Sequence, residues 1–431
     1  MTFKQVPRYE EAYVWIWLPK ATQPVVAGLL TKLGEQLVFN YGRSYLARPD
    51  AISLYAPELP LQLGPIPLIP GLSMPSCIRD ASPDAWGRRV LINSKLGAHR
   101  GEALAFELDE LTYLLESGSD RIGALDFQTS ASVYEPRLAL QPTIENLLNA
   151  AEKVQQGIRL STELDQALLH GTSLGGARPK VLLESDTRKL IAKFSASNDL
   201  YSVVKAEFIA MRLARKVGLQ VATVSLSQAM GRDILLIDRF DRVIRDDGQW
   251  SRRAVVSALT LFELDEMMAS YASYEKFAEI IRHRFMDAKS TLRELFSRIV
   301  FNILCGNTDD HARNHAAFWD GYQLTLTPAY DICPQSRSGE QASQAMLIQG
   351  SDRSSQLGTC IQAASVFLIS QKEAIDIVNA QVKVILQEWE ATCEDAGLSA
   401  VDKAFFWSRQ FLNPFAFQNA PHGVTVPFTV P

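Results

Sequence analysis

Apolar and polar residues alternate with the short period of β-strands in two parts of the chain. In the first part, strands are predicted at residues 13–18, 25–29 and 36–40. In the second part they are predicted at 180–184, 189–194, 221–227 and 233–238. The spacing becomes helical at 84–96, 102–116 and 203–217, and again after Thr143, which is suited to cap a helix. From Leu259 onward the chain is predicted to be mainly helical.

This order of elements predicts an α+β protein made of three successive parts. Residues 1–125 form a strand-rich amino-terminal subdomain, 126–240 a smaller subdomain built on the second group of strands, and 241–431 a mainly helical lobe. A chain of 431 residues is longer than one small core needs, which agrees with more than one domain. The tail 413–431 has proline, glycine and aromatic residues without a helical period, and is predicted to be extended or disordered.

Composition narrows the class of protein. Apolar residues make up 47% and charged residues 21%, as in ordinary soluble globular proteins. The net charge of −5 argues against a chain that binds nucleic acid strongly by itself. Proline and glycine interrupt the longest apolar stretches, and the first residues lack the apolar core of a signal peptide, so no membrane association is expected. Five scattered cysteines favour reduced thiols and a cytoplasmic protein over a disulfide framework or a zinc site.

The candidate chemistry is concentrated in residues 307–314, with the sequence Asn-Thr-Asp-Asp-His-Ala-Arg-Asn. Asp309 is followed five positions later by Asn314, and a second acid, Asp331, comes further along. This is the spacing of a protein-kinase catalytic centre, in which the first Asp accepts the proton of the attacking hydroxyl while the Asn and the second Asp hold Mg²⁺ on ATP. His311 is expected to orient the loop by hydrogen bonds. A turn stabilised by its own Asp and Asn side chains is the alternative.

The surrounding elements favour the kinase hypothesis. An apolar helix at 292–305 precedes the loop, and a predicted hairpin at 318–326 leads into Asp331, which is the order of elements in a kinase C-lobe. Upstream, Lys193 lies on a predicted strand and Glu207 on the next predicted helix, as in the ion pair that positions ATP phosphates. A surface lysine on an alternating strand is the alternative for Lys193.

A glycine- and hydroxyl-rich segment lies just before these strands. Residues 171–180 contain Ser173, Gly175 and Gly176, and their backbone N–H groups are suited to surround phosphate oxygens. The segment matches neither the dinucleotide-binding nor the Walker A pattern. A flexible connection between strands is the alternative.

Taken together, these motifs resemble the HipA family of serine/threonine kinases, the toxin components of bacterial toxin–antitoxin pairs. The resemblance extends in order from about Val14 to beyond Pro334, and its most specific motifs are TSLGGARPK, IAKF, KAEFIAMRLARKVGL, LLIDRFDR, NTDDHARN and LTPAYDI. It implies a protein-kinase-like bilobal fold. It also implies catalysis by Asp309, Mg²⁺ ligation by Asn314 and Asp331, and ATP-phosphate binding by Lys193.

The same resemblance extends to the nucleotide and to regulation. The backbone at Asp238 and Phe240 corresponds to the hinge that meets adenine, and Asp241 to an acid that reaches the ribose. Ser173 corresponds to a loop serine that family members phosphorylate on themselves. About two added negative charges there would repel ATP and switch the kinase off.

The biological role is likewise implied by the resemblance. The expected activity is growth arrest by phosphorylation of a translation component, an aminoacyl-tRNA synthetase being the known kind of target. The expected partner is a small helix-turn-helix antitoxin of the HipB type, through which DNA would be bound indirectly. Two alternatives are a kinase-fold phosphotransferase for small molecules and a catalytically silent subunit of a repressor complex.

Overall fold

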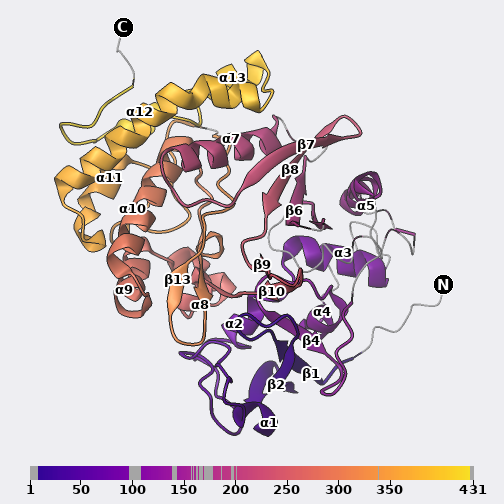
Figure 1. Cartoon of the computed structure of the whole chain (residues 1–431). Coiled ribbons are helices and arrows are strands. Elements are labelled where there is room, and N and C mark those ends of the chain that lie inside the picture. The colour runs from indigo at the N-terminus through magenta and orange to yellow at the C-terminus, as the bar shows by residue number, and fades with distance from the viewer. Residues whose placement is uncertain are drawn as a thin grey trace. The chain divides into compact units, whose positions relative to one another are not determined.

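The computed structural model describes most of the chain, in ranges separated by short gaps. These are residues 8–96, 108–137, 143–156, 178–185, 187–195, 201–337 and 339–427, with 158, 160–161, 164, 168 and 199. The chain divides into two compact units, whose helices and strands are labelled in Figure 1. The first comprises Met1–Asn198, Ser227–Val256 and Phe318–Tyr322, and the second Asp199–Leu226, Ser257–Ala317 and Gln323–Pro431. The three-part division from the sequence stays a prediction.

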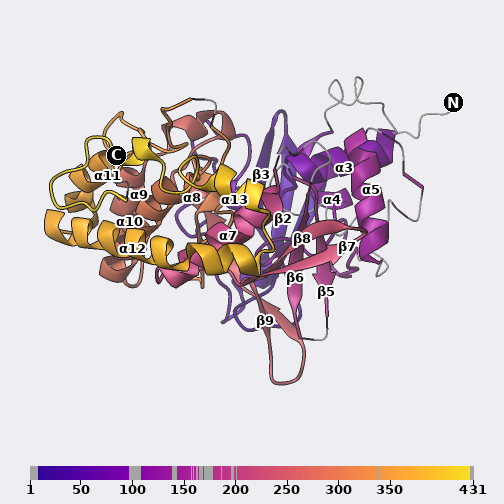
Figure 2. The same ribbon diagram turned by 90° about the horizontal axis from the view of Figure 1, so that it is seen from above.

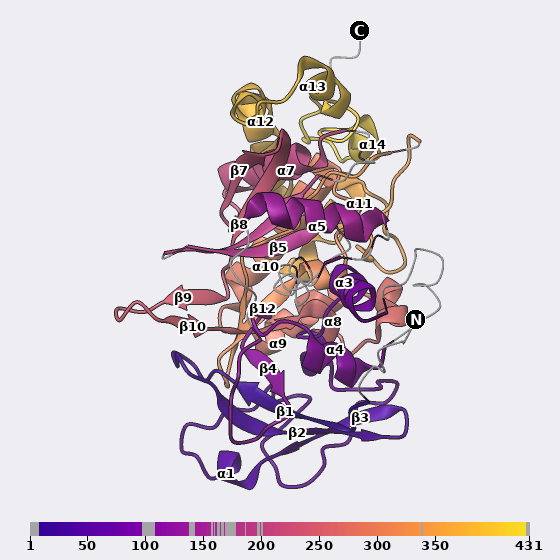
Figure 3. The same cartoon turned by 90° about the vertical axis from the view of Figure 1, so that its right-hand side faces the viewer.

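The first unit begins with a four-stranded antiparallel sheet. Its strand order is β3-β2-β1-β4, formed by β1 (Glu11–Ile16), β2 (Val25–Leu33), β3 (Gln36–Tyr41) and β4 (Leu125–Gln128). Around it lie the helices α1 (Arg43–Leu46), α2 (Ser76–Arg79), α3 (Ala85–Leu96) and α4 (Glu110–Glu116). Helix α4 packs against β1 and β4 (Figure 3). The first three predicted strands are therefore confirmed.

A second sheet contains the strand that bears Lys193. Its order is β5-β6-β8-β7, formed by β5 (Lys180–Glu184), β6 (Lys189–Phe194), β8 (Arg232–Asp238) and β7 (Val224–Ala229). Helix α5 (Ile144–Gln156) lies across it (Figure 3), and a shared core includes Leu147 of α5, Trp86 of α3, Val181, Phe194 and Ile234. Strands β5 and β6 have the bounds that the sequence predicts.

Shorter strands form two further sheets. β9 (Arg242–Ile244) pairs with β10 (Trp250–Arg252), and a three-stranded sheet has the order β11-β12-β13, from β11 (Ala254–Ser257), β12 (Ala316–Trp319) and β13 (Leu324–Leu326). The adjacent strands β12 and β13 are the hairpin predicted between the catalytic loop and Asp331.

The second unit is mainly helical, as predicted. Helix α10 (Ala288–Cys305) is its central element, and the long α12 (Gln371–Asp395) packs along α7 (Val203–Lys216) and contacts α10 (Figure 2). The other helices are α8 (Ala258–Leu261), α9 (Tyr274–Arg284), α11 (Leu357–Gln362), α13 (Ala400–Phe406) and α14 (Pro414–Phe417), with 3₁₀ turns η2 (Glu266–Tyr271), η3 (Ala312–Asn314) and η4 (Ala364–Phe367). None of the helices in the described ranges is both long and apolar enough to cross a membrane.

The carboxyl-terminal tail differs from its prediction. Pro414–Phe417 forms one helical turn, α14, because the Asn413 side chain caps it by accepting from the Phe415 amide at 2.9 Å. Phe415 and Phe417 are buried, and α14 packs against α11. A single turn is too short to show a helical period, so the sequence pattern did not reveal it.

Candidate functional site

The predicted catalytic loop begins where α10 ends. Gly306 follows Cys305 with φ 72° and ψ 24°, the left-handed conformation that closes a helix. A Cβ atom at Gly306 would lie 2.7 Å from the backbone oxygen of Gln410, so a side chain has no space there. Asn307 then donates its backbone N–H to the Asn302 carbonyl at 2.9 Å and its side-chain amide to Asn302 Oδ1 at 3.0 Å. The start of the loop is thus fixed to the end of the helix.

Within the loop, the backbone folds Asp309 and Asn314 together. The His311 N–H donates to the Asp309 carbonyl at 2.8 Å, and the Asn314 N–H donates to the His311 carbonyl at 2.8 Å. The Asn314 side-chain nitrogen also donates to the Asp309 carbonyl, at 3.1 Å. Because that nitrogen is used, the amide oxygen of Asn314 is the atom suited to bind a cation.

A second pair of loop residues, Asp310 and His315, also lies close together. Asp310, only 4% exposed, accepts through Oδ2 from both the Tyr274 hydroxyl and His315 Nε2, the latter at 2.8 Å. Burial raises the pKa of Asp310, but His315 and Tyr274 outweigh it and hold that pKa below its usual value. Asp310 and His315 directly follow Asp309 and Asn314, so their bond fixes the two ends of the loop.

Asp331 completes the group of predicted catalytic residues. It has φ 59°, a left-handed backbone conformation that is uncommon outside glycine. The preceding Tyr330 donates its hydroxyl to the Arg313 carbonyl at 2.7 Å, which ties this strand end to the loop. Burial raises the pKa of Asp309, and the nearby carboxylates of Asp331 and Asp310 raise it further, against the opposing effect of His311.

The donor chemistry of these residues fits a hard cation. Burial is the main cause of the raised pKa of Asp309, and the negative charge of Asp331 adds to it; a divalent cation would relieve that repulsion. Across the described part of the chain, no three His, Cys, Asp or Glu side chains are grouped so as to hold a metal. Mg²⁺ needs no such group, because it usually takes one or two protein carboxylates and completes its shell with phosphate oxygens and water. Asn314 and Asp331 therefore fit Mg²⁺.

The two residues of the predicted phosphate-binding ion pair are both buried. Lys193 is 8% exposed on β6, opposite Lys180 on β5 and Leu235 on β8. Glu207 is 3% exposed on α7. The alternative of a surface lysine is therefore wrong for Lys193, while its ion pair with Glu207 stays a prediction. Charged side chains are seldom this buried unless they have partners or a ligand.

The residues predicted to contact adenine and ribose lie at the end of β8. The Asp238 side chain is partly exposed and binds Arg188 at 2.7 Å, and the Phe240 ring packs edge-on against Phe318 at 5.8 Å. These contacts involve side chains only, so the predicted contact of the Asp238 and Phe240 backbone with adenine stays a prediction.

The Asp241 carboxylate, predicted to contact ribose, is buried and bound by protein donors. It is 2% exposed, and its two oxygens accept from Arg239, from Arg242 and from the Gly123 N–H, at 2.8–3.0 Å. Arg239 and Arg242 also bind Asp120. This placement favours a structural role for Asp241, and its contact with ribose stays a prediction.

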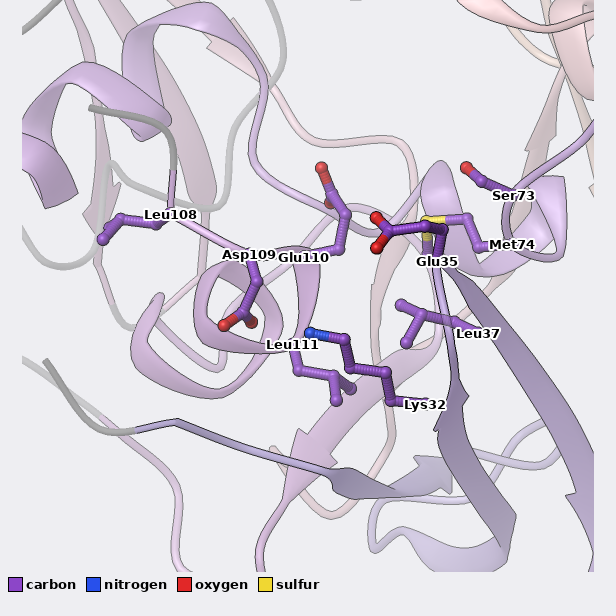
Figure 4. Close-up of a pocket in the computed structure, with 9 residues that line it drawn as sticks. All are labelled: Lys32, Glu35, Leu37, Ser73, Met74, Leu108, Asp109, Glu110 and Leu111. Carbon is purple, nitrogen blue, oxygen red and sulfur yellow. The ribbon is translucent and has the colours of Figure 1, made fainter. Parts of the chain in front are cut away.

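The predicted phosphate loop and a pocket also belong to the first unit. Ser173, Gly175 and Gly176 lie outside the described residues, so the phosphate loop and its serine stay predictions. A pocket of about 260 Å³ lies between the β2–β3 hairpin and the start of α4, with Lys32, Glu35 and Glu110 around it (Figure 4). None of the predicted site residues lines this pocket.

The sequence interpretation missed the role of Asp310, His315 and Tyr274. A signal for the first two was present, because Asp310 and His315 repeat the five-residue spacing of Asp309 and Asn314. Tyr274 gave no signal, since it precedes Asp310 by 36 positions and reaches it only in the folded chain.

Family models match most of the chain. Residues 19–128 match the HipA N-terminal domain, and residues 172–389, about half of the chain, match the HipA-like C-terminal domain. The chain belongs to the HipA family. The match to the HipA-like C-terminal domain includes Asp309, Asn314 and Asp331, the predicted catalytic and metal-binding residues.

Individual relatives are distant. The serine/threonine-protein kinase toxin HipA of Shewanella oneidensis is 26% identical over 279 residues, which cover 58% of this chain and 60% of that protein. The protein Y4mE of Sinorhizobium fredii is 28% identical over 136 residues, covering 29% of this chain and 31% of that protein. The matches thus span less than two thirds of either relative.

A solved structure shows the fold. The Shewanella oneidensis HipA, determined with HipB and operator DNA, matches 89% of this chain and 92% of its own with a TM-score of 0.66 and 19% identity. This confirms the α+β, kinase-like fold class predicted from the sequence.

Proposed function

We propose that this HipA-family chain is a Mg²⁺- and ATP-dependent protein serine/threonine kinase. The observation that supports this most directly is the folded loop in which the Asn314 side chain binds the Asp309 carbonyl at 3.1 Å. This bond holds a candidate base and a candidate metal ligand at fixed positions, with the Asp331 carboxylate close enough to raise the pKa of Asp309. Phosphoryl transfer depends mainly on such positioning and on charge neutralisation.

In the proposed reaction, Asp309 orients the hydroxyl of a serine or threonine and accepts its proton. The hydroxyl oxygen forms a bond to the γ-phosphorus of ATP while the bond from that phosphorus to the leaving ADP oxygen breaks. Asn314, through its amide oxygen, and Asp331 would hold Mg²⁺, which supplies positive charge to the phosphates. Lys193 would bind the phosphates, with Glu207 orienting it, and His311 would orient the loop by hydrogen bonds.

The remaining roles follow from the family. The backbone at Asp238 and Phe240 would meet adenine, and Gly175 and Gly176 would let the loop close over the phosphates. Ser173 would be phosphorylated by the kinase itself, which would eject the loop and stop ATP binding.

The proposed biological role is that of a growth-arresting toxin. The Shewanella oneidensis relative is named a serine/threonine-protein kinase toxin, and the matching structure contains HipB and operator DNA. By extension, this chain would phosphorylate a protein of translation, with an aminoacyl-tRNA synthetase as the expected class. A small HipB-like antitoxin would neutralise it and would provide most of the contact to DNA, consistent with the net charge of −5.

The test is phosphate transfer by the full-length Asp309→Asn variant. Incubation with Mg²⁺ and radiolabelled ATP is expected to show transfer slower by roughly 10²–10⁴-fold than in the wild type, the usual contribution of a positioned base. Asp395→Asn is a matched control, because Asp395 is an exposed acid in the same unit that only approaches Arg212 at 3.6 Å. Unchanged transfer by a folded Asp309→Asn protein would refute the assignment.

A further inference from the structure

The 3₁₀ turn η2 exposes three large apolar side chains. Met267 is 89% exposed, Tyr271 65% and Met268 46%, and none of the six residues of η2 is buried. A turn that contributes nothing to the core, yet exposes methionine and tyrosine together, has the composition of a protein-binding surface. Methionine adapts its shape to different partners, and tyrosine offers a large contact area with one polar atom.

This turn is held firmly beside the candidate catalytic loop. At its start, Glu266 forms an ion pair with Arg313, which lies between Asp309 and Asn314. Near its end, Arg353 donates to the Ser270 carbonyl at 2.8 Å and to the Ala345 carbonyl at 3.1 Å.

A further bond ties this end of the turn to the loop. The Ala345 N–H donates to the carbonyl of Thr308, the residue before Asp309, at 3.0 Å. Both ends of η2 are thereby linked to the two ends of the catalytic loop. Its exposed side chains are therefore not those of a freely moving surface loop.

The charge around η2 limits what it can bind. Residues 258–279 contain five acids and one lysine, Lys276, which pairs with Glu279. Among the described residues, Arg284 and Arg313 pair with Glu263 and Glu266, while Arg353 binds backbone carbonyls. The segment and these three arginines together carry one net negative charge. The surface suits a polypeptide that offers apolar and basic side chains, and it would repel an anionic membrane or an acidic peptide.

We propose that Met267, Met268 and Tyr271 form a docking surface for the protein substrate, occupied by the segment that flanks its acceptor serine or threonine. That segment would place an apolar residue on Met267 and Tyr271 and a lysine or arginine near the acidic side chains. The inference rests on the proposed function, because it assigns the occupant as substrate. It adds a basis for substrate choice, since the roles proposed for the catalytic loop involve only the hydroxyl and the phosphates.

The test measures peptide binding without ATP, so it does not depend on phosphate transfer. The probe is a fluorescein-labelled peptide with one central serine flanked by leucine and lysine, titrated with full-length protein and followed by anisotropy. The double variant Met267→Ser/Tyr271→Ser is expected to raise Kd by about tenfold or more, the range of interface hot spots. Met267→Leu/Tyr271→Phe should restore binding, and Val401→Ser is the control, because Val401 is 79% exposed on α13 in the same unit.

Several outcomes would overturn the proposal. These are equal binding by wild type and double variant, equal binding of a peptide with glutamate in place of lysine, and no binding of any of the peptides. A wild-type dimer that the double variant dissociates, seen by sedimentation, would assign the surface to a second copy instead. If the expected binding pattern holds but Mg²⁺ and ATP give no phosphate transfer, the surface binds peptides as described, while its assignment to a kinase substrate fails with the kinase assignment.

Discussion

Substitution of the buried Asp241 can tell whether its carboxylate stabilises the fold or binds a ligand. Its two oxygens accept four hydrogen bonds at 2.8–3.0 Å, two from Arg239, one from Arg242 and one from the Gly123 amide. Arg239 and Arg242 are themselves almost fully buried and share a second acid, Asp120. Asp241→Asn keeps the shape but removes the charge, and it turns an N–H₂ group toward groups that already donate.

The expected cost follows from this arrangement. Removing one partner of a buried, hydrogen-bonded charge network costs about 3–5 kcal/mol, because the remaining charges stay buried without compensation. For a unit of this size, a loss of about 1 kcal/mol lowers Tm by roughly 2–4 °C. Asp241→Asn should therefore lower Tm by roughly 6–20 °C, with no direct effect on ATP affinity in the protein that remains folded.

The measurement combines thermal unfolding with calorimetric titration of ATP in the presence of Mg²⁺, below the Tm of the variant. Asp246→Asn is the matched control, five residues later, because Asp246 is an exposed acid in the turn between β9 and β10. Its loss should cost less than about 1 kcal/mol.

The pH dependence gives an independent check. Burial raises the pKa of Asp241, but Arg239 and Arg242 outweigh it, so the folded-state pKa lies below its usual value. The stabilisation is then fully present above the unfolded pKa of about 3.9 and is lost as the pH falls through the lower folded value. The stability difference between wild type and Asp241→Asn should be constant near neutral pH and should narrow only in acid. An unchanged Tm together with weaker ATP binding would refute the structural role and favour the ribose contact.

Three other outcomes are expected in the second unit. Asp331→Ala should abolish the gain in ATP affinity that Mg²⁺ gives the wild type in calorimetric titration, and an equal gain in both proteins would place the metal elsewhere. Asp310→Ala and Tyr274→Phe should each destabilise the protein in urea, with a coupling energy of roughly 1.5–3 kcal/mol in a double-mutant cycle, as for a hydrogen bond to a charged group, and additive effects would contradict their bond. Gly306→Ala should cost about 1–2 kcal/mol from its backbone angle, plus the clash with Gln410. Gly397→Ala should show the angle cost alone, since φ is 56° there and the nearest atom is the flexible Lys205 Nζ at 3.8 Å.

The sequence predicted what depends on local spacing. The five residues from Asp309 to Asn314 form one turn of backbone, closed by hydrogen bonds within the loop itself, so their spacing alone predicts that they act together. The strands β5 and β6 were predicted with correct bounds because alternation and burial act on consecutive residues. Such features need no knowledge of the rest of the chain.

Asp241 shows where this kind of inference ends. Its place in a family motif implies a ribose contact, which stays a prediction, and that motif is local. Its partners include the Gly123 amide, 118 residues earlier, and Arg239 and Arg242 are shared with Asp120 from the same distant segment. A carboxylate that receives four buried donors has little capacity left for a ligand. A distant segment supplies the Gly123 amide and the shared Asp120. The burial and the partners of this carboxylate therefore depend on the tertiary fold, and the local motif does not reveal them.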